Sequence, residues 1–179
     1  MTQQPEIVTL VKPTVELANA YNSMVEDSIV NGEGYPYNNI ALARSDFGAF
    51  LRELDEEAHG IGLPPGIAPQ ETYLLYRDDG TVLGEIRFRP SLLPPYEEHN
   101  GHIGYNIRPS ERGKGYATKQ LGLLLKIART TGLKGVMLPI EGHNPASARV
   151  IEIHGGKPIR QITNPNSATP VTCYWIDLG

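Results

Sequence analysis

The first third of the chain carries one strand-like pattern followed by two helical ones. Residues 7–11 are a β-branched run that predicts an opening strand. After Pro13, apolar positions recur about every 3.6 residues as far as Ile29, which predicts an amphipathic helix. Ser45 and Asp46 then offer an N-cap for a second amphipathic helix, with its phenylalanines and leucines on one face. We therefore expect strand, helix, loop and helix in this region.

The middle third has the pattern of an antiparallel meander. Residues 72–77 and 81–89 are strand-like runs separated by an Asp-Asp-Gly turn, which is typical of a β-hairpin. Residues 102–108 form a third strand-like run, which Pro109 ends. The segment 60–69 contains three Gly and three Pro, so we expect a surface loop there rather than a linker between domains.

The last third alternates helical and strand-like patterns. No break in the pattern marks a second core, so residues 1–179 are expected to form a single α+β domain with a mixed sheet. The expected elements are a helix at 115–131, a strand at 135–140, a helix at 145–153 and strands at 157–163 and 170–178.

Composition and charge narrow the classes of function. Sixteen basic and twenty acidic residues give a net charge of −4, the wrong sign for binding a phosphate backbone, so no nucleic-acid partner is expected. The apolar runs are far shorter than the roughly 20 residues of a membrane span, and the first residues lack the features of a signal peptide, so we expect a cytoplasmic protein with no membrane partner. One cysteine, Cys173, excludes an internal disulfide and a multi-cysteine zinc site, and no metal is expected.

A glycine-rich segment separates the third strand of the meander from the longest predicted helix. The first backbone amides of a helix have no partner within the helix, and the helix dipole adds positive potential at that end. Gly113 and Gly115 permit positive φ and leave room for a phosphate beside the amides. Arg112 and Lys114 add positive charge that a diphosphate can meet. The segment therefore indicates an anion site.

Other glycine loops fit this segment less well. A Walker loop needs four residues between its glycines and a Lys-Ser or Lys-Thr after them, and both are missing here. A dinucleotide fingerprint needs Gly or Ala where Thr118 stands, which makes a Rossmann-like fold a weak alternative. Taken alone, the segment could also be an ordinary turn before a helix.

The segment resembles the phosphate loop of the GNAT acetyltransferase superfamily, which reads Arg or Gln, two residues, Gly, one residue, then Gly or Ala. Arg112, Gly115 and Ala117 fall on those positions. Asn144 and Ser147, followed by a Gly pair, look like the family's late helix beside the pantetheine arm. Residues 101–112 are similar to a subfamily of predicted acetyltransferases of unassigned substrate. The resemblance is strong from about residue 72 to 160 and only architectural outside that range.

The resemblance implies a fold and a cosubstrate. The fold is a GNAT-type mixed, mostly antiparallel central sheet of about six or seven strands, flanked by helices and splayed between the fourth and fifth strands. The cosubstrate is acetyl-CoA, with its diphosphate on the amides of 112–117 and its pantetheine between the strands at 102–108 and 135–140. The residues expected to bind it are Tyr105, Asn106, Ile107, Arg108, Arg112, Gly113, Lys114, Gly115, Tyr116, Ala117, Thr118, Asn144 and Ser147.

Acetyl transfer to an amine needs a proton acceptor for the amine and stabilisation of the departing sulfur. Glu98 and His102 are the candidate bases, although a charged residue after a Pro-rich loop is commonly a solvated rim and a His at a strand start is commonly structural. Many relatives place a tyrosine acid on the late helix, where this chain has Ile151. Tyr105 could replace it by position, although strand tyrosines are mostly packing residues.

Together these features predict an N-acetyltransferase that moves the acetyl group of acetyl-CoA to a primary amine, on a small molecule or a peptide, by direct attack in a ternary complex. The alternative is a non-catalytic CoA-binding or regulatory domain on the same fold, which Ile151 motivates. Because relatives are often dimers, a homodimer is a further expectation. The acceptor amine has no signature in the sequence.

Overall fold

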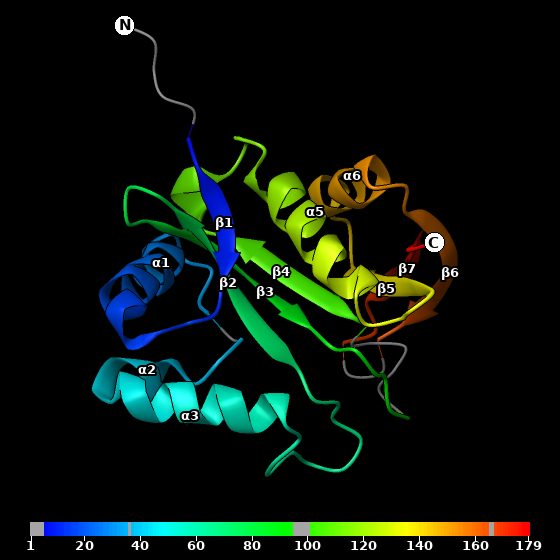
Figure 1. Cartoon of the computed structure of the whole chain (residues 1–179). Helices are drawn as coiled ribbons and strands as arrows, with labels where there is room; N and C mark the ends of the chain where they lie inside the picture. The colour runs from blue at the N-terminus through cyan, green and yellow to red at the C-terminus, as the bar shows by residue number, and fades with distance from the viewer. Residues whose placement is uncertain (1–5, 36, 95–100, 165–166) are drawn as a thin grey trace, which may run out of the picture.

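The strands of the protein form two antiparallel sheets, as the computed structural model in Figure 1 shows. The structure describes residues 6–35, 37–94, 101–164 and 167–179. In chain order the elements are β1 (Val8–Val11), a 3-10 helix (Val15–Leu17), α1 (Ala18–Val30), α2 (Ile40–Ser45), α3 (Phe47–Ala58), β2 (Glu71–Arg77), β3 (Val82–Phe88), β4 (Ile103–Ile107), a second 3-10 helix (Pro109–Glu111), α5 (Tyr116–Arg129), β5 (Gly135–Glu141), α6 (Pro145–Ile153), β6 (Lys157–Thr163) and β7 (Pro170–Asp177).

The strand order corrects one expectation and confirms another. The strands follow the orders β1-β2-β3-β4 and β5-β7-β6, and every neighbouring pair in these two sheets is antiparallel. An α+β fold with antiparallel strands and flanking helices is therefore confirmed, whereas one continuous mixed sheet is not what the described residues form. The reason lies between β4 and β5. They approach where the His102 N–H donates to the Met137 carbonyl at 2.8 Å, and a cavity separates them farther along.

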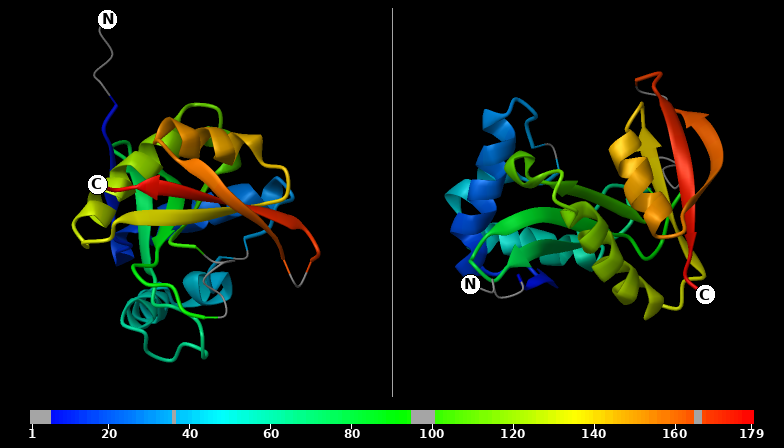
Figure 2. Two further views of the ribbon diagram at one scale, coloured as in Figure 1. Left: turned by 90° about the vertical axis from the view of Figure 1, so that its right-hand side faces the viewer. Right: turned by 90° about the horizontal axis from the view of Figure 1, so that it is seen from above.

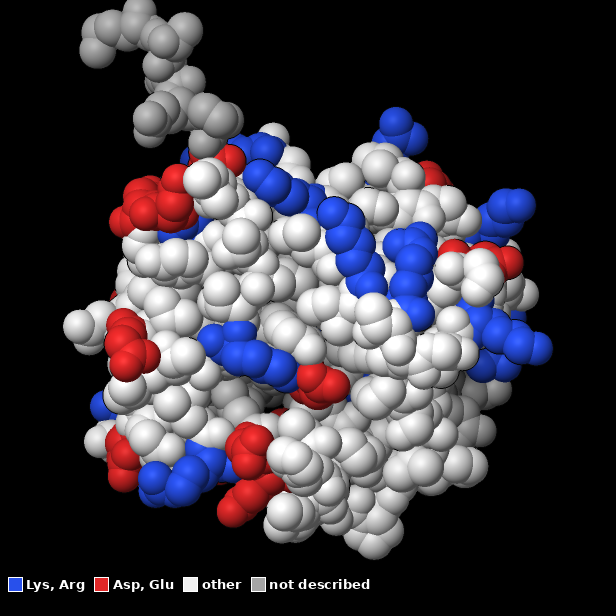
Figure 3. All heavy atoms as spheres, in the orientation of Figure 1, with Lys and Arg blue, Asp and Glu red and all other residues white. Residues whose placement is uncertain are grey.

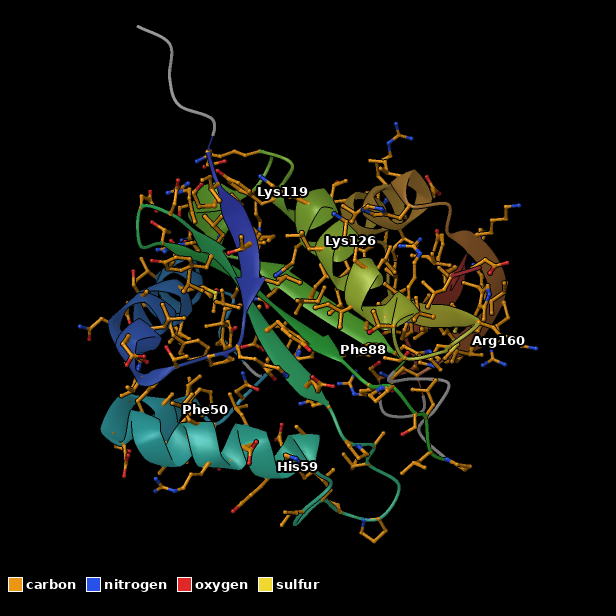
Figure 4. All side chains as sticks on the ribbon, viewed as in Figure 1. Phe50, His59, Phe88, Lys119, Lys126 and Arg160 are labelled. Atoms are coloured by element: carbon orange, nitrogen blue, oxygen red, sulfur yellow. The ribbon has the colours of Figure 1, made fainter. Side chains whose placement is uncertain are left out.

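Helices cover both faces of the four-stranded sheet, which explains why its central strand β3 is buried throughout. The right-hand view of Figure 2 shows α1 and α5 on opposite sides of this sheet. Phe50 of α3 packs with Tyr21 on one side, and Phe88 of β3 packs with Leu121 of α5 on the other. Figure 4 labels both phenylalanines. Each is fully buried, and burying a side chain of this size contributes about 1.5–3 kcal/mol to the free energy of folding.

Side-chain caps fix two helix starts that position the functional region. Asp46 caps α3, where its Oδ1 accepts a hydrogen bond from the Ala49 N–H at 2.8 Å. Asn144 caps α6, where its Oδ1 accepts from the Ser147 N–H at 3.0 Å. The short helix α2 was not predicted, because six residues are too few to show a helical period.

Two further observations concern the described residues as a set. None of their helices is long and apolar enough to cross a bilayer. They also contain no group of three or more His, Cys, Asp or Glu side chains that could hold a metal ion.

Candidate active site

A cavity of about 570 Å³ lies beside β4 and the N-terminal end of α5. All the residues that the sequence assigned to the cofactor line it, with the exception of Arg108 and Lys114. The lining also includes five residues that the sequence had not singled out, namely Glu33, Tyr37, Glu111, Ala146 and Val150. Segments distant in the chain therefore meet at one site.

The glycine loop has the backbone geometry of an open anion site. Gly113 and Gly115 have φ values of +76° and +82°, and a Cβ added at either position would meet no atom within 4 Å. The need for glycine is therefore conformational in both cases. Gly115 is the N-cap of α5, and no side chain caps this end. The amides of the first turn are thus left for a ligand.

Arg112 is the basic residue of the loop that reaches the cavity, and it already has an anionic partner. Its Nη1 and Nη2 donate to the two carboxylate oxygens of Glu33 at 2.5 and 2.7 Å, and its Nε donates to the Ile107 carbonyl at 2.9 Å. The hydrogen bond from Arg112 lowers the pKa of Glu33, and the same contact raises the pKa of Arg112. The pair joins the loop after α1 to the loop before α5.

The two expected cofactor residues outside the cavity make ion pairs elsewhere. Arg108 donates through Nε to Asp27 at 3.1 Å, which ties the end of β4 to α1. Lys114 donates to Glu111 at 2.8 Å. Neither side chain lines the larger cavity, and the part that each was expected to play in binding the cofactor stays a prediction.

A second cavity, of about 270 Å³, lies between β4 and β5. Gly104 of β4, Pro139 of β5 and Arg87 of β3 contribute to its walls. It shares four lining residues with the larger cavity, and these are Tyr37, Tyr105, Asn144 and Ser147. The two cavities therefore adjoin along β4, which gives the site one part beside the glycine loop and another between the two sheets.

Tyr105 lines both cavities and has a hydroxyl suited to donating a proton. Its O–H points to the Ser147 carbonyl at 3.4 Å, a long hydrogen bond that leaves the group available. Burial raises the pKa of Tyr105 above its usual value near 10, so the hydroxyl is protonated at neutral pH.

The two candidate bases have different outcomes. Glu98 lies outside the described residues, so its role stays a prediction. His102 is buried, and its Nδ1 accepts a hydrogen bond from the Met137 N–H at 2.9 Å. Burial, aided by Arg89, lowers its pKa and keeps the ring neutral. Since His102 lines neither cavity, these contacts favour a structural role in tying β4 to β5.

A buried polar cluster behind the smaller cavity was missed in the sequence. Glu85 of β3 is fully buried, and its Oε2 accepts hydrogen bonds from the Tyr35 hydroxyl at 3.1 Å and from Asn38 at 2.6 Å. Burial raises its pKa. Two strand positions on, Arg87 is 7% exposed. The available signal was the pair of charged residues at alternate positions of an otherwise apolar strand, which places both on one face.

Basic side chains also lie along the outer side of α5, as Figure 3 shows, and Figure 4 labels Lys119 and Lys126 among them. Neither lysine lines a cavity. Among the described residues that do, the basic ones are Arg112 in the larger cavity and Arg87 in the smaller. The positive charge inside the site is therefore confined to two points.

Comparison with known structures identifies the fold. The chain superposes on RimJ from Mycobacterium smegmatis, solved in complex with CoA-disulfide, with a TM-score of 0.70 and 16% identity over 95% of this chain and 81% of that one. It is also similar to yncA from Salmonella typhimurium, solved with its cofactor acetyl-CoA, with a TM-score of 0.64 and 18% identity over 96% and 94% of the two chains.

The spermidine/spermine N-acetyltransferase SpeG from Vibrio cholerae, in mutant forms, gives a TM-score of 0.62 and 14% identity over 96% of this chain and 95% of that one. No curated protein matches the chain. At these identities the likeness establishes the fold alone. The family model for the acetyltransferase (GNAT) domain matches residues 8–157. The chain therefore belongs to the GNAT acetyltransferase family.

Proposed function

We propose that the protein transfers the acetyl group of acetyl-CoA to a primary amine, on a small molecule or a peptide, by direct attack in a ternary complex. The observation that carries this proposal is the pair of adjoining cavities, which meet at Tyr105, Asn144 and Ser147. One has an uncapped helix end for a diphosphate, and the other offers separate space for an acceptor. The similarity to SpeG, a spermidine/spermine N-acetyltransferase, supports an amine acceptor.

The residues of the larger cavity fit the cosubstrate. We place the diphosphate on the amides of 113–118, with Arg112 as the nearby cation. The pantetheine arm would lie along β4, in the part of the larger cavity lined by Tyr105, Asn106 and Ile107, and its thioester end would reach the mouth of the smaller cavity between β4 and β5. The observed pairing supports this placement, because β4 pairs with β3 along one edge and has no strand partner in its own sheet along the other. Backbone groups on that second edge can hydrogen-bond the pantetheine amides.

Acetyl transfer requires the protein to orient the two substrates and to assist two proton transfers. The amine nitrogen bonds to the thioester carbon, the carbon–sulfur bond breaks, and the amine loses a proton as the sulfur gains one. In our proposal the Tyr105 hydroxyl donates the proton that the sulfur takes up. Of the two predicted bases we prefer Glu98, because Nδ1 of His102 is occupied by the Met137 N–H.

A specific observation keeps a second candidate function open. Ile151, which stands where many relatives have a tyrosine, lines the smaller cavity and is only 1% exposed. A protein that kept the cofactor site and lost the reaction would act as a CoA-binding or regulatory domain. Under that function the acceptor cavity would hold no reacting amine.

Two measurements separate these functions. Calorimetric titration with acetyl-CoA tests the cofactor site, and release of CoA thiol over a panel of polyamines, amino acids and peptides tests transfer. Binding together with thiol release supports the acetyltransferase. Binding without release on the whole panel supports the non-catalytic domain, and a failure to bind acetyl-CoA contradicts both.

A homodimer and a cytoplasmic location remain predictions of the sequence. The homodimer has one candidate surface in the structure, because β6 is an edge strand of its sheet and carries the exposed Ile159. Light scattering coupled to size exclusion would give the oligomeric state.

A further inference from the structure

The guanidinium of Arg87 lies over the ring of Tyr37, and both residues line the smaller cavity. Arg87 lies opposite Gly104 in the β3–β4 ladder. A Cβ on Gly104 would lie 3.4 Å from Nη2 of Arg87, a van der Waals contact that places this end of the guanidinium directly beside Gly104. On its other side Cζ lies 4.1 Å from the centre of the Tyr37 ring. A cation over an aromatic ring is attracted to the ring face, and this contact uses none of the hydrogen-bond donors of the guanidinium.

The donors of this guanidinium are not saturated by the protein. Arg87 is 7% exposed, and its buried Nε has no hydrogen-bond partner among the described residues. The neighbouring carboxylate oxygen, Oε1 of Glu85, is 3.6 Å from that nitrogen, which is an ion-pair distance but too long for a hydrogen bond. A buried cation with unused donors is costly, and an anionic ligand group would remove that cost.

Glu85 fills this role only in part. Its Oε1 forms the 3.6 Å ion pair with Nε of Arg87 and has no hydrogen-bond partner among the described residues, while its other oxygen is directed elsewhere. Its Oε2 accepts from Tyr35 and Asn38, which flank the loop that carries Tyr37. Glu85 thereby holds that loop over Arg87 and balances part of the arginine charge. Nη2 lies beside Gly104, which lines the smaller cavity together with Arg87.

The remaining charge of the cavity suits a ligand with two charged groups. Arg87 is the basic residue of the described lining, and Glu141 is the acidic one. Glu141 accepts hydrogen bonds from Asn164 and Ser167 through one carboxylate oxygen, Oε1. A zwitterion could meet both charges, whereas a polyamine would bring an ammonium group beside the positive charge of Arg87.

We propose that the acceptor is a small primary amine that also carries a carboxylate, and that Arg87 binds this carboxylate through its Nη groups. A planar carboxylate matches the two-pronged edge of a guanidinium, which can donate two parallel hydrogen bonds to it. The inference rests on the proposed function, since it names the substrate class of that same site.

Matched ligands provide the test. The protein would first be saturated with CoA, which carries no acetyl group and cannot react. We would then titrate into it the common amino acids, their carboxamides, their decarboxylated amines and spermidine. The same compounds would then be compared by thiol release with acetyl-CoA. We expect at least one amino acid to bind about 100-fold more tightly than its carboxamide, the size of effect seen when a buried charged contact is removed. No preference for any carboxylate over its carboxamide would overturn the inference.

Substitution of Arg87 ties the preference to this side chain. Arg87→Met is expected to abolish the preference for carboxylates while the Kd for acetyl-CoA changes less than about 2-fold. Because this change leaves Glu85 without its ion pair, the double variant Glu85→Gln with Arg87→Met serves as a second form in which both charges are removed. Lys126→Met, on the outer side of α5, is the matched control for loss of one positive charge. A weaker affinity for acetyl-CoA, or an equal loss for all ligands, would assign Arg87 to the cofactor or the fold instead.

The binding arm separates the two proposals. If carboxylate amines bind the CoA complex selectively and through Arg87 but no thiol is released, the acceptor-site inference stands and the transferase proposal fails. If thiol is released with amines that lack a carboxylate at rates unaffected by Arg87→Met, the transferase stands and the inference fails.

Discussion

Glu33 and Arg112 form an ion pair with two hydrogen bonds, at 2.5 and 2.7 Å, that joins the loop after α1 to the loop before α5. Both residues line the larger cavity. Arg112 is also the loop cation nearest to where the diphosphate is proposed to lie. A diphosphate at that position would therefore compete with Glu33 for the same guanidinium edge.

Glu33→Gln should tighten the binding of acetyl-CoA. The pair is about half exposed, and such pairs are worth about 0–1 kcal/mol, so the expected decrease in Kd is at most about 5-fold. Titration calorimetry measures it, with Glu26→Gln, which removes an exposed carboxylate paired to Arg44, as the control. A weaker affinity would instead show that Glu33 orients Arg112 for the ligand.

The same substitution should alter the response of stability to acid. Arg112 lowers the pKa of Glu33 in the folded protein below the ordinary value of 4.5. A depressed carboxyl pKa contributes stability that is present above about pH 4.5 and is lost as the pH falls through the lowered value. Any difference in unfolding free energy between Glu33→Gln and the native protein should thus be present at pH 7 and shrink below pH 4. Denaturant titrations of both proteins at pH 7 and in acid measure this difference. A difference in unfolding free energy that persisted in acid would contradict the assignment.

Tyr105→Phe should slow transfer without weakening cofactor binding. If the hydroxyl protonates the departing sulfur, kcat should fall about 10- to 100-fold while the KM for acetyl-CoA stays within about 2-fold. Because burial raises the pKa of Tyr105, the native enzyme should keep this step up to about pH 10. A pH–rate profile of both forms tests the assignment, and an unchanged kcat in the Phe form would refute it.

How far the sequence predicts this molecule depends on how locally each feature is encoded. The anion loop occupies 112–118 without interruption, so its glycines and the following helix could be read together. The predicted Asp46 cap is equally local and is confirmed, and the Asn144 cap, which was not predicted, is of the same local kind. Such features depend on neighbouring residues and on nothing else in the chain.

Features that depend on register were missed. Arg87 meets Gly104 only because β3 and β4 pair as they do, and it meets Tyr37 only because Glu85 anchors the loop after α1. The single expected sheet failed for a similar reason, since the contact of His102 with Met137 and the cavity beyond it lie between strands distant in sequence. A pattern of polar and apolar residues carries no record of such pairings.

Gly115→Ala should weaken acetyl-CoA binding by more than its effect on folding. Gly115 has φ +82°, a conformation that costs an alanine about 1–2 kcal/mol, and no atom lies within 4 Å to clash with a Cβ. Relief of that strain would turn the first amides of α5 away from the diphosphate. Gly132→Ala is the matched control, because Gly132 has φ +79° and equally open surroundings but lines neither cavity. We expect the two variants to lose similar amounts of stability and only Gly115→Ala to lose affinity for acetyl-CoA. Equal affinities of the two variants for acetyl-CoA would contradict the anion-site assignment.

His102→Leu separates a structural role from a catalytic one. The Nδ1 of His102 accepts the buried Met137 N–H, and a leucine offers no acceptor, so the donor is left unpaired at a cost of about 1–3 kcal/mol of unfolding free energy. Because burial lowers the folded pKa of His102 below its usual 6.5, its contribution is fully present above about pH 6.5 and is lost as the pH falls through the lowered value. The native protein should therefore lose stability in mild acid, and the His102→Leu variant, which has no imidazole to protonate, should not show this loss. If His102 were instead the base, the substitution would reduce kcat about 100-fold or more with little change in unfolding free energy at pH 7. Parallel measurement of kcat and of denaturant unfolding from pH 5 to 8 distinguishes the two, since only the structural role couples the loss to pH through stability.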